Sequence, residues 1–237
     1  MAIDISIIIP AYNEGRTIEE VIVSLYRLLS GSEYSFQLII VDDGSKDDTK
    51  VIAQQALEHL EKGKCSFQLI SKENGGKGSA IRAGIPYVEG DYVIIQDADL
   101  ENDPQDILRM LQVIKSENLN VLYGSRFLKT ENKSLYPAFY WGGRVVTMAT
   151  NVLFGQRLTD EPTCYKMFSS DLLKSIDLKC KGFEFCPEVT AKVSKKGYKI
   201  KEIPISYFPR TKEEGKKLSW KDGVEALWTL LKYRFVK

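Results

Sequence analysis

Three acidic residues, Asp97, Asp99 and Glu101, stand at every second position directly after an apolar run in the stretch VIIQDADLEND, residues 93–103. In an extended chain alternate side chains share a face, so the three carboxylates are expected to point into one cleft. Carboxylates held this close raise one another's pKa unless a cation lies between them. A divalent cation that prefers oxygen ligands, Mg²⁺ or Mn²⁺, meets that need and bridges to phosphate oxygens. The stretch therefore predicts metal and nucleotide binding.

Ordinary capping of secondary structure is the simpler interpretation of these acidic residues. In that interpretation Asp97 or Asp99 only ends the strand, and Asp103 caps a helix whose first turn contains Pro104. We expect a cap for Asp103. A cap does not require the acidic pair upstream, so metal and nucleotide binding remains the preferred role of Asp97 and Asp99.

A second acidic pair, Asp42 and Asp43, ends another apolar run in IIVDDGSKDDT. A carboxylate at such a place can accept hydrogen bonds from a base N–H or from a ribose hydroxyl. We therefore predict a nucleotide contact for one of the two residues. Asp47 or Asp48 is expected to cap the helix that follows.

A glycine-rich stretch, KENGGKGSAIRAG, lies between these two acidic motifs. It lacks the spacing of Gly-x-x-x-x-Gly-Lys-Ser/Thr, and it also lacks the third glycine of Gly-x-Gly-x-x-Gly. The glycines still predict a close approach of the backbone to a ligand, with Lys77 near a phosphate or a base. A flexible turn before a helix is the alternative.

Apolar strand-like runs alternate with helical periodicity over the first 125 residues. The expected strands lie at 5–9, 37–41, 66–70, 92–96 and 120–124. The expected helices lie near 15–30, 47–62, 77–88 and 104–117. This alternation is typical of a mostly parallel sheet with helices on both faces, so we predict an α/β, Rossmann-like fold. Ligands bind at the carboxyl ends of such strands, where PAYNEG and the three polar motifs above are expected to meet.

The pattern is weaker after residue 125. We expect a helix near 136–155, a short strand in TCYKMF, a helix near 184–196 and a strand in YKIKEIPISYF. The chain then becomes basic and ends in an amphipathic helix. We therefore divide it into a catalytic domain, residues 1–210, and a C-terminal segment, residues 211–237.

The composition is that of an ordinary globular protein, with 43% hydrophobic and 27% charged residues and a formal net charge of +1 over 237 residues. This balance gives no support to nucleic-acid binding. The four cysteines form no Cys-x-x-Cys pair and only one histidine is present, which argues against a zinc site and a Ser-His-Asp triad. The N-terminal run is strand-like and no stretch of 18 uncharged apolar residues occurs, so we expect a cytoplasmic protein without a membrane span.

The motifs IIIPAYNE, VDDGSKDDT, NGGKGSAIRAG, QDADLE, YGSRF and EPTCYKMF, in this order and spacing, resemble the family 2 inverting glycosyltransferases with the glycosyltransferase A fold. The resemblance is strongest to the dolichol-phosphate mannosyltransferases and polyprenyl-phosphate glucosyltransferases, and it covers nearly the whole chain. It implies a nucleotide diphosphate sugar as donor and Mg²⁺ or Mn²⁺ as cofactor. The residues expected to bind the nucleotide are then Pro10, Tyr12, Glu14, Asp42, Asp43, Lys77, Asp97, Ala98 and Asp99. The metal is expected on Asp97, Asp99 and Glu101.

Three arginines are candidates for binding the phosphate of a lipid acceptor, which the resemblance also implies. They are Arg126 in YGSRF, Arg144 in a helical stretch and Arg210 at the start of the basic segment. Arginine donates parallel hydrogen bonds that suit phosphate oxygens, whereas a surface ion pair is the alternative for each. Asp160 resembles an acidic position near the acceptor, with Glu161 as its neighbouring alternative. We expect Asp160 to act as a base or as a positioning group.

The last expected helix has an apolar face that contains two tryptophans and is flanked by basic residues. This face consists of Trp220, Val224, Leu227, Trp228, Leu231 and Phe235. Such a face suits the headgroup boundary of a membrane, and a helix packed on the protein's own core is the alternative. We expect peripheral contact with the inner face of a membrane, with a membrane protein as a further partner.

The sequence thus predicts a metal-dependent enzyme with Asp97, Asp99 and Asp160 in its catalytic centre. It is expected to move a hexose from a nucleotide diphosphate sugar, of the GDP-mannose or UDP-glucose type, to a polyprenyl or dolichyl phosphate with inversion. One alternative is transfer to a hydroxyl group of a glycan in cell-surface polysaccharide synthesis, for which Asp160 has to accept a proton. The other is a nucleotide-binding scaffold without turnover that serves a membrane partner.

Overall fold

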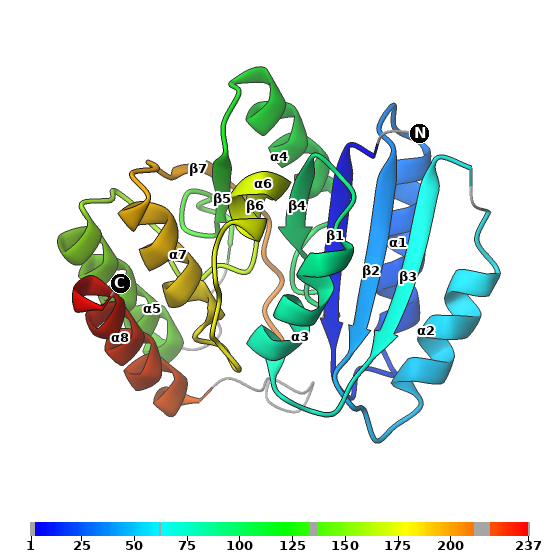
Figure 1. Cartoon of the computed structure of the whole chain (residues 1–237), viewed down its shortest axis with the longest axis horizontal. Helices are drawn as coiled ribbons and strands as arrows, with labels where there is room; N and C mark the ends of the chain where they lie inside the picture. Colours follow the sequence, from blue (N-terminus) through cyan, green and yellow to red (C-terminus); the bar gives the residue numbers. More distant parts are fainter. Residues whose placement is uncertain (1–2, 62, 133–136, 211–218, 237) are drawn as a thin grey trace.

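The computed structural model describes residues 3–61, 63–132, 137–210 and 219–236, and within them one seven-stranded sheet has the order β3-β2-β1-β4-β6-β5-β7 (Figure 1). The strands are β1 Ile5–Ala11, β2 Phe36–Asp42, β3 Cys65–Ser71, β4 Tyr92–Ile95, β5 Val121–Ser125, β6 Lys166–Ser169 and β7 Lys201–Pro204. The helices are α1 Ile18–Ser30, α2 Thr49–Glu58, α3 Lys77–Gly84, α4 Gln105–Ser116, α5 Pro137–Phe154, α6 Ser170–Lys174, α7 Phe185–Lys195 and α8 Trp220–Phe235. A short 3₁₀ helix, Ile85–Tyr87, follows α3.

The mostly parallel sheet confirms the fold class predicted from the sequence. Strands β1, β2, β3 and β4 are parallel neighbours, and β5 and β7 form a second parallel pair. Strand β6 lies between the two groups and is antiparallel to both β4 and β5. Its position was expected as a short strand, but its direction was not predicted.

Alternate residues of the central strands face two separate hydrophobic cores. On β1, Ile7 and Ile9 belong to the core that also contains the apolar faces of α1 and α4, whereas Ile8 packs with α3 and α7 on the other side. All three isoleucines are fully buried. Burial on both faces explains why these strands appear in the sequence as continuous apolar runs.

The parallel strands all end at one edge of the sheet, where polar loops lead into the next helices. Asp47 Oδ1 accepts a hydrogen bond from Thr49 N at 3.1 Å at the start of α2. Asp103 Oδ1 accepts one from Gln105 N at 2.9 Å at the start of α4. These bonds confirm the capping roles predicted for Asp103 and for one of the pair 47 and 48. They also fix where the loops leave the sheet edge.

Helix α8 packs against α5 and α7, as Figure 1 shows at the red end of the chain. Its buried residues are Thr229, Leu230 and Tyr233. Lys195 Nζ of α7 donates to the carbonyl oxygens of Tyr233 and Val236, at 2.9 and 2.6 Å, and so holds the last turn of α8. In the described segments no helix combines the length and apolar character that crossing a bilayer requires.

The strand expected over residues 198–208 is much shorter in the structure. Strand β7 ends at Pro204, and the chain then crosses to the loop after β4, where Tyr207 forms an isolated antiparallel bridge with Asn102. Phe208 N donates to the carbonyl oxygen of Glu101 at 2.8 Å. This crossing brings Arg210 to the acidic loop. The basic residues Lys212, Lys216 and Lys217 that follow lie outside the described residues.

Gly90 marks a place where the chain approaches the backbone of β1 too closely for a side chain. A Cβ atom there would lie 2.7 Å from both Ile5 C and Ser6 N. We predict that Gly90→Ala lowers the free energy of unfolding by about 2 kcal/mol, because the two backbones have to move apart. Gly63→Ala is the control, since a Cβ atom there meets nothing within 4 Å. Equal stability of the two variants in urea denaturation would contradict this packing.

Candidate active site

A cavity of about 1200 Å³ opens at the carboxyl edge of the sheet and continues between α5 and α8. Most of the residues selected from the sequence line it. They are Pro10, Tyr12, Glu14, Asp43, Lys77, Asp97, Ala98, Asp99, Glu101, Arg126 and Arg210. Three selected residues, Asp42, Arg144 and Asp160, are not part of the cavity wall. The polar loops of four parallel strands thus meet as expected.

The acidic loop, residues 97–101, reaches the cavity through a turn. The extended geometry expected beyond the strand is wrong, because β4 ends at Ile95 and the chain turns over residues 98–100. Leu100 has a φ of 59°, in the left-handed region, and Glu101 N donates to Asp99 Oδ1 at 3.1 Å. The three acidic residues still line one cavity, but a turn rather than an extended chain brings them there.

Each carboxylate of the acidic loop has a cationic or N–H partner. Lys77 Nζ lies 2.5 Å from Asp97 Oδ1, and Arg210 Nη2 lies 3.0 Å from Asp99 Oδ2. Arg210 N donates to Glu101 Oε1 at 2.8 Å, and its Nη1 lies 3.3 Å from Glu14 Oε2. Within the described residues, no three acidic, histidine or cysteine side chains are placed so that they could hold a metal ion together.

The donor atoms of this cluster nevertheless suit a divalent cation. Four carboxylates, those of Glu14 and of the three acidic-loop residues, lie here with two cations, Lys77 and Arg210. Burial and the neighbouring Asp97 and Glu101 raise the pKa of Asp99 to about 7, although Arg210 opposes this rise. The donors are hard oxygens that suit Mg²⁺ or Mn²⁺. The residues present therefore fit the cofactor predicted from the sequence.

Asp43 holds the glycine-rich loop at the end of the cavity that lies on the sheet edge. Its carboxylate accepts hydrogen bonds from Gly75 N at 3.1 Å, Gly76 N at 2.7 Å and Asn74 Nδ2 at 3.2 Å. Lys72 Nζ forms an ion pair with it at 2.6 Å. Buried carboxylates are stabilised by such donors. Asp43 therefore sets the backbone path into α3.

The two neighbours of this loop, Asp42 and Lys77, differ in their access to the cavity. Asp42 is buried, and its Oδ1 accepts a hydrogen bond from Ser45 N at 3.2 Å. Lys77 begins α3 directly after Gly76, whose φ is 90°, and its Nζ also lies 3.0 Å from Cys164 Sγ. Burial opposes the charge of Lys77, but Asp97 raises its pKa well above the ordinary value. Lys77 thus stays a cation inside the cavity wall.

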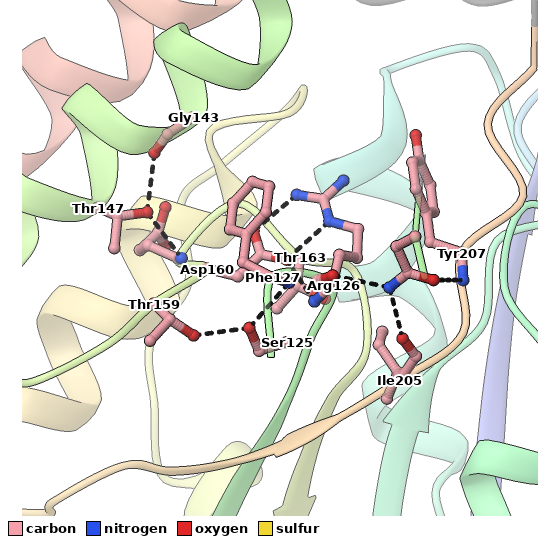
Figure 2. Close-up of polar contacts among 12 residues, drawn as sticks. Ser125, Arg126, Phe127, Gly143, Thr147, Thr159, Asp160, Thr163, Ile205 and Tyr207 are labelled. Carbon is pink, nitrogen blue, oxygen red and sulfur yellow. Dashed lines mark hydrogen bonds and ion pairs between the residues drawn. The ribbon is translucent and has the colours of Figure 1, made fainter. Parts of the chain in front are cut away.

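Arg126 and Asp160 form a bidentate ion pair, shown in Figure 2. The distances are 2.7 Å from Nε to Oδ2 and 2.7 Å from Nη2 to Oδ1, and Arg126 N also donates to Oδ2 at 2.9 Å. Asp160 is fully buried. Of the two roles expected for Asp160, these contacts favour the positioning group, because both of its oxygens are bound to Arg126. The guanidinium lies beside the rings of Phe127 and Tyr207.

The three arginines selected for an acceptor phosphate do not form one cluster. Arg144 is exposed, donates to the carbonyl oxygen of Thr159 at 3.2 Å and lies 5.7 Å from the centre of the Phe127 ring. Arg126 lies 5.9 Å from the centre of the same ring. Arg210, in contrast, lies among the carboxylates of the acidic loop. Arg126 and Arg144 thus share Phe127 as a neighbour, whereas Arg210 contacts a different set of side chains.

Residues 6–177, more than half of the chain, match the sequence profile described as Glycosyl transferase family 2. The chain belongs to this family. The match begins in β1 and ends after α6, so it includes the acidic loop, the glycine-rich loop, Arg126 and Asp160. The β7 crossing and α8 lie beyond it.

Curated relatives of this family 2 chain include three glycosyltransferases. Glycosyltransferase AglJ of Haloferax volcanii is 27% identical over 87% of the chain and 63% of its own length. Dolichol-phosphate mannosyltransferase of Pyrococcus furiosus is 26% identical over 90% of the chain and 58% of its own length. Undecaprenyl-phosphate 4-deoxy-4-formamido-L-arabinose transferase of Pseudomonas syringae is 36% identical over 46% of the chain and 32% of its own length. The chain thus spans between a third and just under two thirds of these relatives.

Solved structures of glucosyl-3-phosphoglycerate synthase from Mycobacterium tuberculosis share the fold. The complex with phosphoglyceric acid has a TM-score of 0.74 at 20% identity and covers 99% of this chain and 81% of its own. The complex with Mn²⁺, uridine diphosphate and glucosyl-3-phosphoglycerate has a TM-score of 0.71 at 21% identity, with the same coverage. At this identity the likeness supports the glycosyltransferase A fold predicted from the sequence.

Glu161 and Cys164 are among the cavity residues that the sequence motifs did not single out. Glu161, considered only as a neighbour of Asp160, is fully buried and lines the cavity. Its Oε1 accepts a hydrogen bond from Thr190 at 2.8 Å, and burial raises its pKa. Cys164 lines the cavity beside Lys77. The acidic character of TDEP was a signal for Glu161, whereas no pattern in the sequence pointed to Cys164.

We predict that Asp43→Ala lowers the free energy of unfolding by about 3 kcal/mol, because Lys72 and three N–H donors lose a buried carboxylate. The loosened loop should also weaken the binding of nucleoside diphosphates. Urea denaturation and titration with UDP and GDP measure the two effects. Asp48→Ala, at an exposed position of the same motif, is the control. An Asp43→Ala variant as stable as this control would show that the loop does not depend on Asp43.

Proposed function

We propose that this chain transfers a hexose from a nucleotide diphosphate sugar to a polyprenyl or dolichyl phosphate, with inversion at the anomeric carbon. One observation carries the proposal. A single cavity joins the acidic loop at the sheet edge to an apolar surface formed by α5 and α8. A polar donor needs access from the polar end of the cavity, and a lipid-linked acceptor needs access from the apolar surface. The names of two relatives include a dolichol or undecaprenyl phosphate and support this acceptor class.

The donor is held at the carboxyl edge of the parallel strands. Pro10, Tyr12 and Glu14 follow β1, and Asp43 with its loop follows β2. These residues enclose the end of the cavity where a nucleoside is expected in such sheets. Lys77 contributes a permanent positive charge near the position proposed for the diphosphate.

In the proposed site Asp97, Asp99 and Glu101 supply the oxygen ligands of Mg²⁺ or Mn²⁺. A divalent cation bound there would neutralise the charge of the departing nucleoside diphosphate. The closely spaced carboxylate oxygens of the acidic loop are the reason that these side chains suit such an ion. Lys77 and Arg210 keep the carboxylates stable in its absence.

The acceptor phosphate is proposed to bind at Arg126. Its guanidinium is oriented by Asp160 on one side and by the rings of Phe127 and Tyr207 on the other. Arg144, beside the same phenylalanine, adds a second positive charge. A phosphate oxygen is ionised at neutral pH and attacks without a general base, so orientation and charge neutralisation carry the reaction. This agrees with an Asp160 that is fully engaged by Arg126.

The membrane side of the proposal rests on the α5–α8 face, the exposed apolar residues of these two helices. The face consists of Trp141, Val145, Met148, Val152, Trp220, Val224, Trp228, Leu231 and Phe235. Trp228 is 66% exposed and Phe235 is 82% exposed, although α8 is anchored through its other side. Tryptophans flanked by Lys221 and Lys232 suit the headgroup region of a bilayer. A lipid tail then lies on this face while its phosphate enters the cavity.

Transfer to a hydroxyl acceptor is the second candidate, and the position of Glu161 favours it. Glu161 lines the cavity, and burial raises the pKa of its carboxyl group above the ordinary value. A hydroxyl acceptor needs such a base, whereas a phosphate acceptor does not. The two candidates therefore differ in the chemical class of the product.

The decisive experiment incubates the protein with Mn²⁺, a short polyprenyl phosphate and a panel of radiolabelled nucleotide sugars. We expect label from one donor to enter the organic phase, and Asp99→Ala to reduce this transfer roughly a hundredfold or more with an unchanged circular dichroism spectrum. Label confined to a water-soluble glycan would favour the hydroxyl acceptor. Nucleotide binding without release of nucleoside diphosphate would indicate a scaffold, and full turnover by Asp99→Ala would remove the acidic loop from the mechanism.

Replacement of Trp228 by glutamate tests the α5–α8 face. We predict that Trp228→Glu weakens binding to anionic phospholipid vesicles about tenfold, because a charge replaces an aromatic ring at the headgroup boundary. Vesicle flotation measures the bound fraction. Val51→Glu, which places the same charge at an exposed position of α2, should bind like the unmodified protein. Equal loss in both variants would argue against a specific face.

A further inference from the structure

We infer that Arg210 is a resident counter-cation of the acidic loop, which competes with the divalent ion for Asp99 and Glu101 and so makes binding of that ion depend on the nucleotide. The inference rests on the proposed function, since it deepens the account of the same site. Arg210 then acts at the donor end, whereas the sequence predicted that it binds the acceptor phosphate.

The contacts of Arg210 surround one guanidinium with three carboxylates. Nη2 lies 3.0 Å from Asp99, Nη1 lies 3.3 Å from Glu14, and Nε lies 3.8 Å from Glu101. The side chain is only 16% exposed. A partly buried arginine with this many acidic neighbours is strongly attracted to them, because little water screens the charges. Two of the three neighbours belong to the predicted metal ligands.

The backbone of this segment is fixed independently of the guanidinium. Ser206 N donates to Asp106 Oδ2 at 2.6 Å, and Tyr207 N donates to Asn132 Oδ1 at 3.0 Å. Phe208 N donates a hydrogen bond to the carbonyl oxygen of Glu101, next to the bridge between residues 102 and 207. The chain can thus keep its position while the side chain of Arg210 rotates away. Exchange of the guanidinium for another cation therefore requires no refolding of the crossing.

Competition follows from the shared ligands. Asp99 and Glu101 cannot give the same oxygen atoms fully to Arg210 and to a divalent ion, so the ion has to displace the guanidinium. A nucleoside diphosphate adds further negative charge and oxygen ligands, which shifts the balance toward the ion. Arg210 thus disfavours metal binding before the nucleotide arrives. Once displaced, its charge remains available inside the cavity that Arg126 also lines.

The test measures Mn²⁺ binding by electron paramagnetic resonance of the free ion, without nucleotide or acceptor, together with thermal unfolding. We expect Arg210→Gln to bind Mn²⁺ about tenfold more tightly than the unmodified protein, which corresponds to about 1.4 kcal/mol of lost competition. The same variant should melt at a lower temperature without metal, because the carboxylates lose a counter-charge. The gain in affinity should vanish in the double variant Asp99→Ala with Arg210→Gln.

Arg109→Gln is the matched control, because Arg109 pairs with Asp106 at 2.6 Å and touches the same crossing without reaching the acidic loop. It should lower stability and leave Mn²⁺ affinity unchanged. If Arg210→Gln does not fold, Mn²⁺ affinity is measured on Arg210→Lys instead, since lysine keeps the charge but loses the forked contacts. Mn²⁺ affinity equal to or below that of the unmodified protein in the folded variant would overturn the inference. None of these measurements involves sugar transfer, so a failure of the proposed reaction would leave their result unaffected.

Discussion

The constraint on which the structure depends is the gathering of negative charge in a mostly buried loop at the edge of a parallel sheet. Four carboxylates share this space with Lys77 and Arg210, which come from the start of α3 and from the crossing after β7. Neither cation is close to the acidic loop in the chain. The acidic loop therefore depends on two distant segments that bring positive charge to one place. In the proposed reaction the same carboxylates hold the metal ion on the diphosphate.

The two ends of the cavity are linked by side chains that serve both. Tyr207 Oη donates to Glu101 Oε2 at 3.1 Å, and the Tyr207 ring lies 5.1 Å from the guanidinium carbon of Arg126. Arg126 in turn is bound to Asp160, whose backbone N–H donates to Glu202 of β7 at 3.0 Å. The acidic loop and Arg126 are thus joined through β7 and its crossing. In the proposed reaction, a change at one end is transmitted to the other by direct contact.

The sequence allowed the prediction of the elements and of most residues around the cavity, because continuous apolar strands and polar strand ends are local patterns. The direction of β6 could not be predicted from the sequence, because it depends on non-local pairing with β4 and β5. The turn at residues 98–100 was missed because the alternation of acidic residues suggested extended chain. The partners of Asp160 and Arg210 are separated from them by 34 and 111 positions, and no spacing rule predicts such contacts.

The antiparallel strand β6 also sets the distance between the acidic loop and Arg126. It separates β4, which leads to the acidic loop, from β5, which leads to Arg126. Neighbouring strands lie about 4.8 Å apart, so one inserted strand keeps the two loops roughly 10 Å from each other. That interval is comparable to the breadth of one sugar ring with its flanking phosphates. The strand order of the sheet therefore fixes the distance between the two loops. In the proposed reaction this distance admits a single monosaccharide between leaving group and nucleophile.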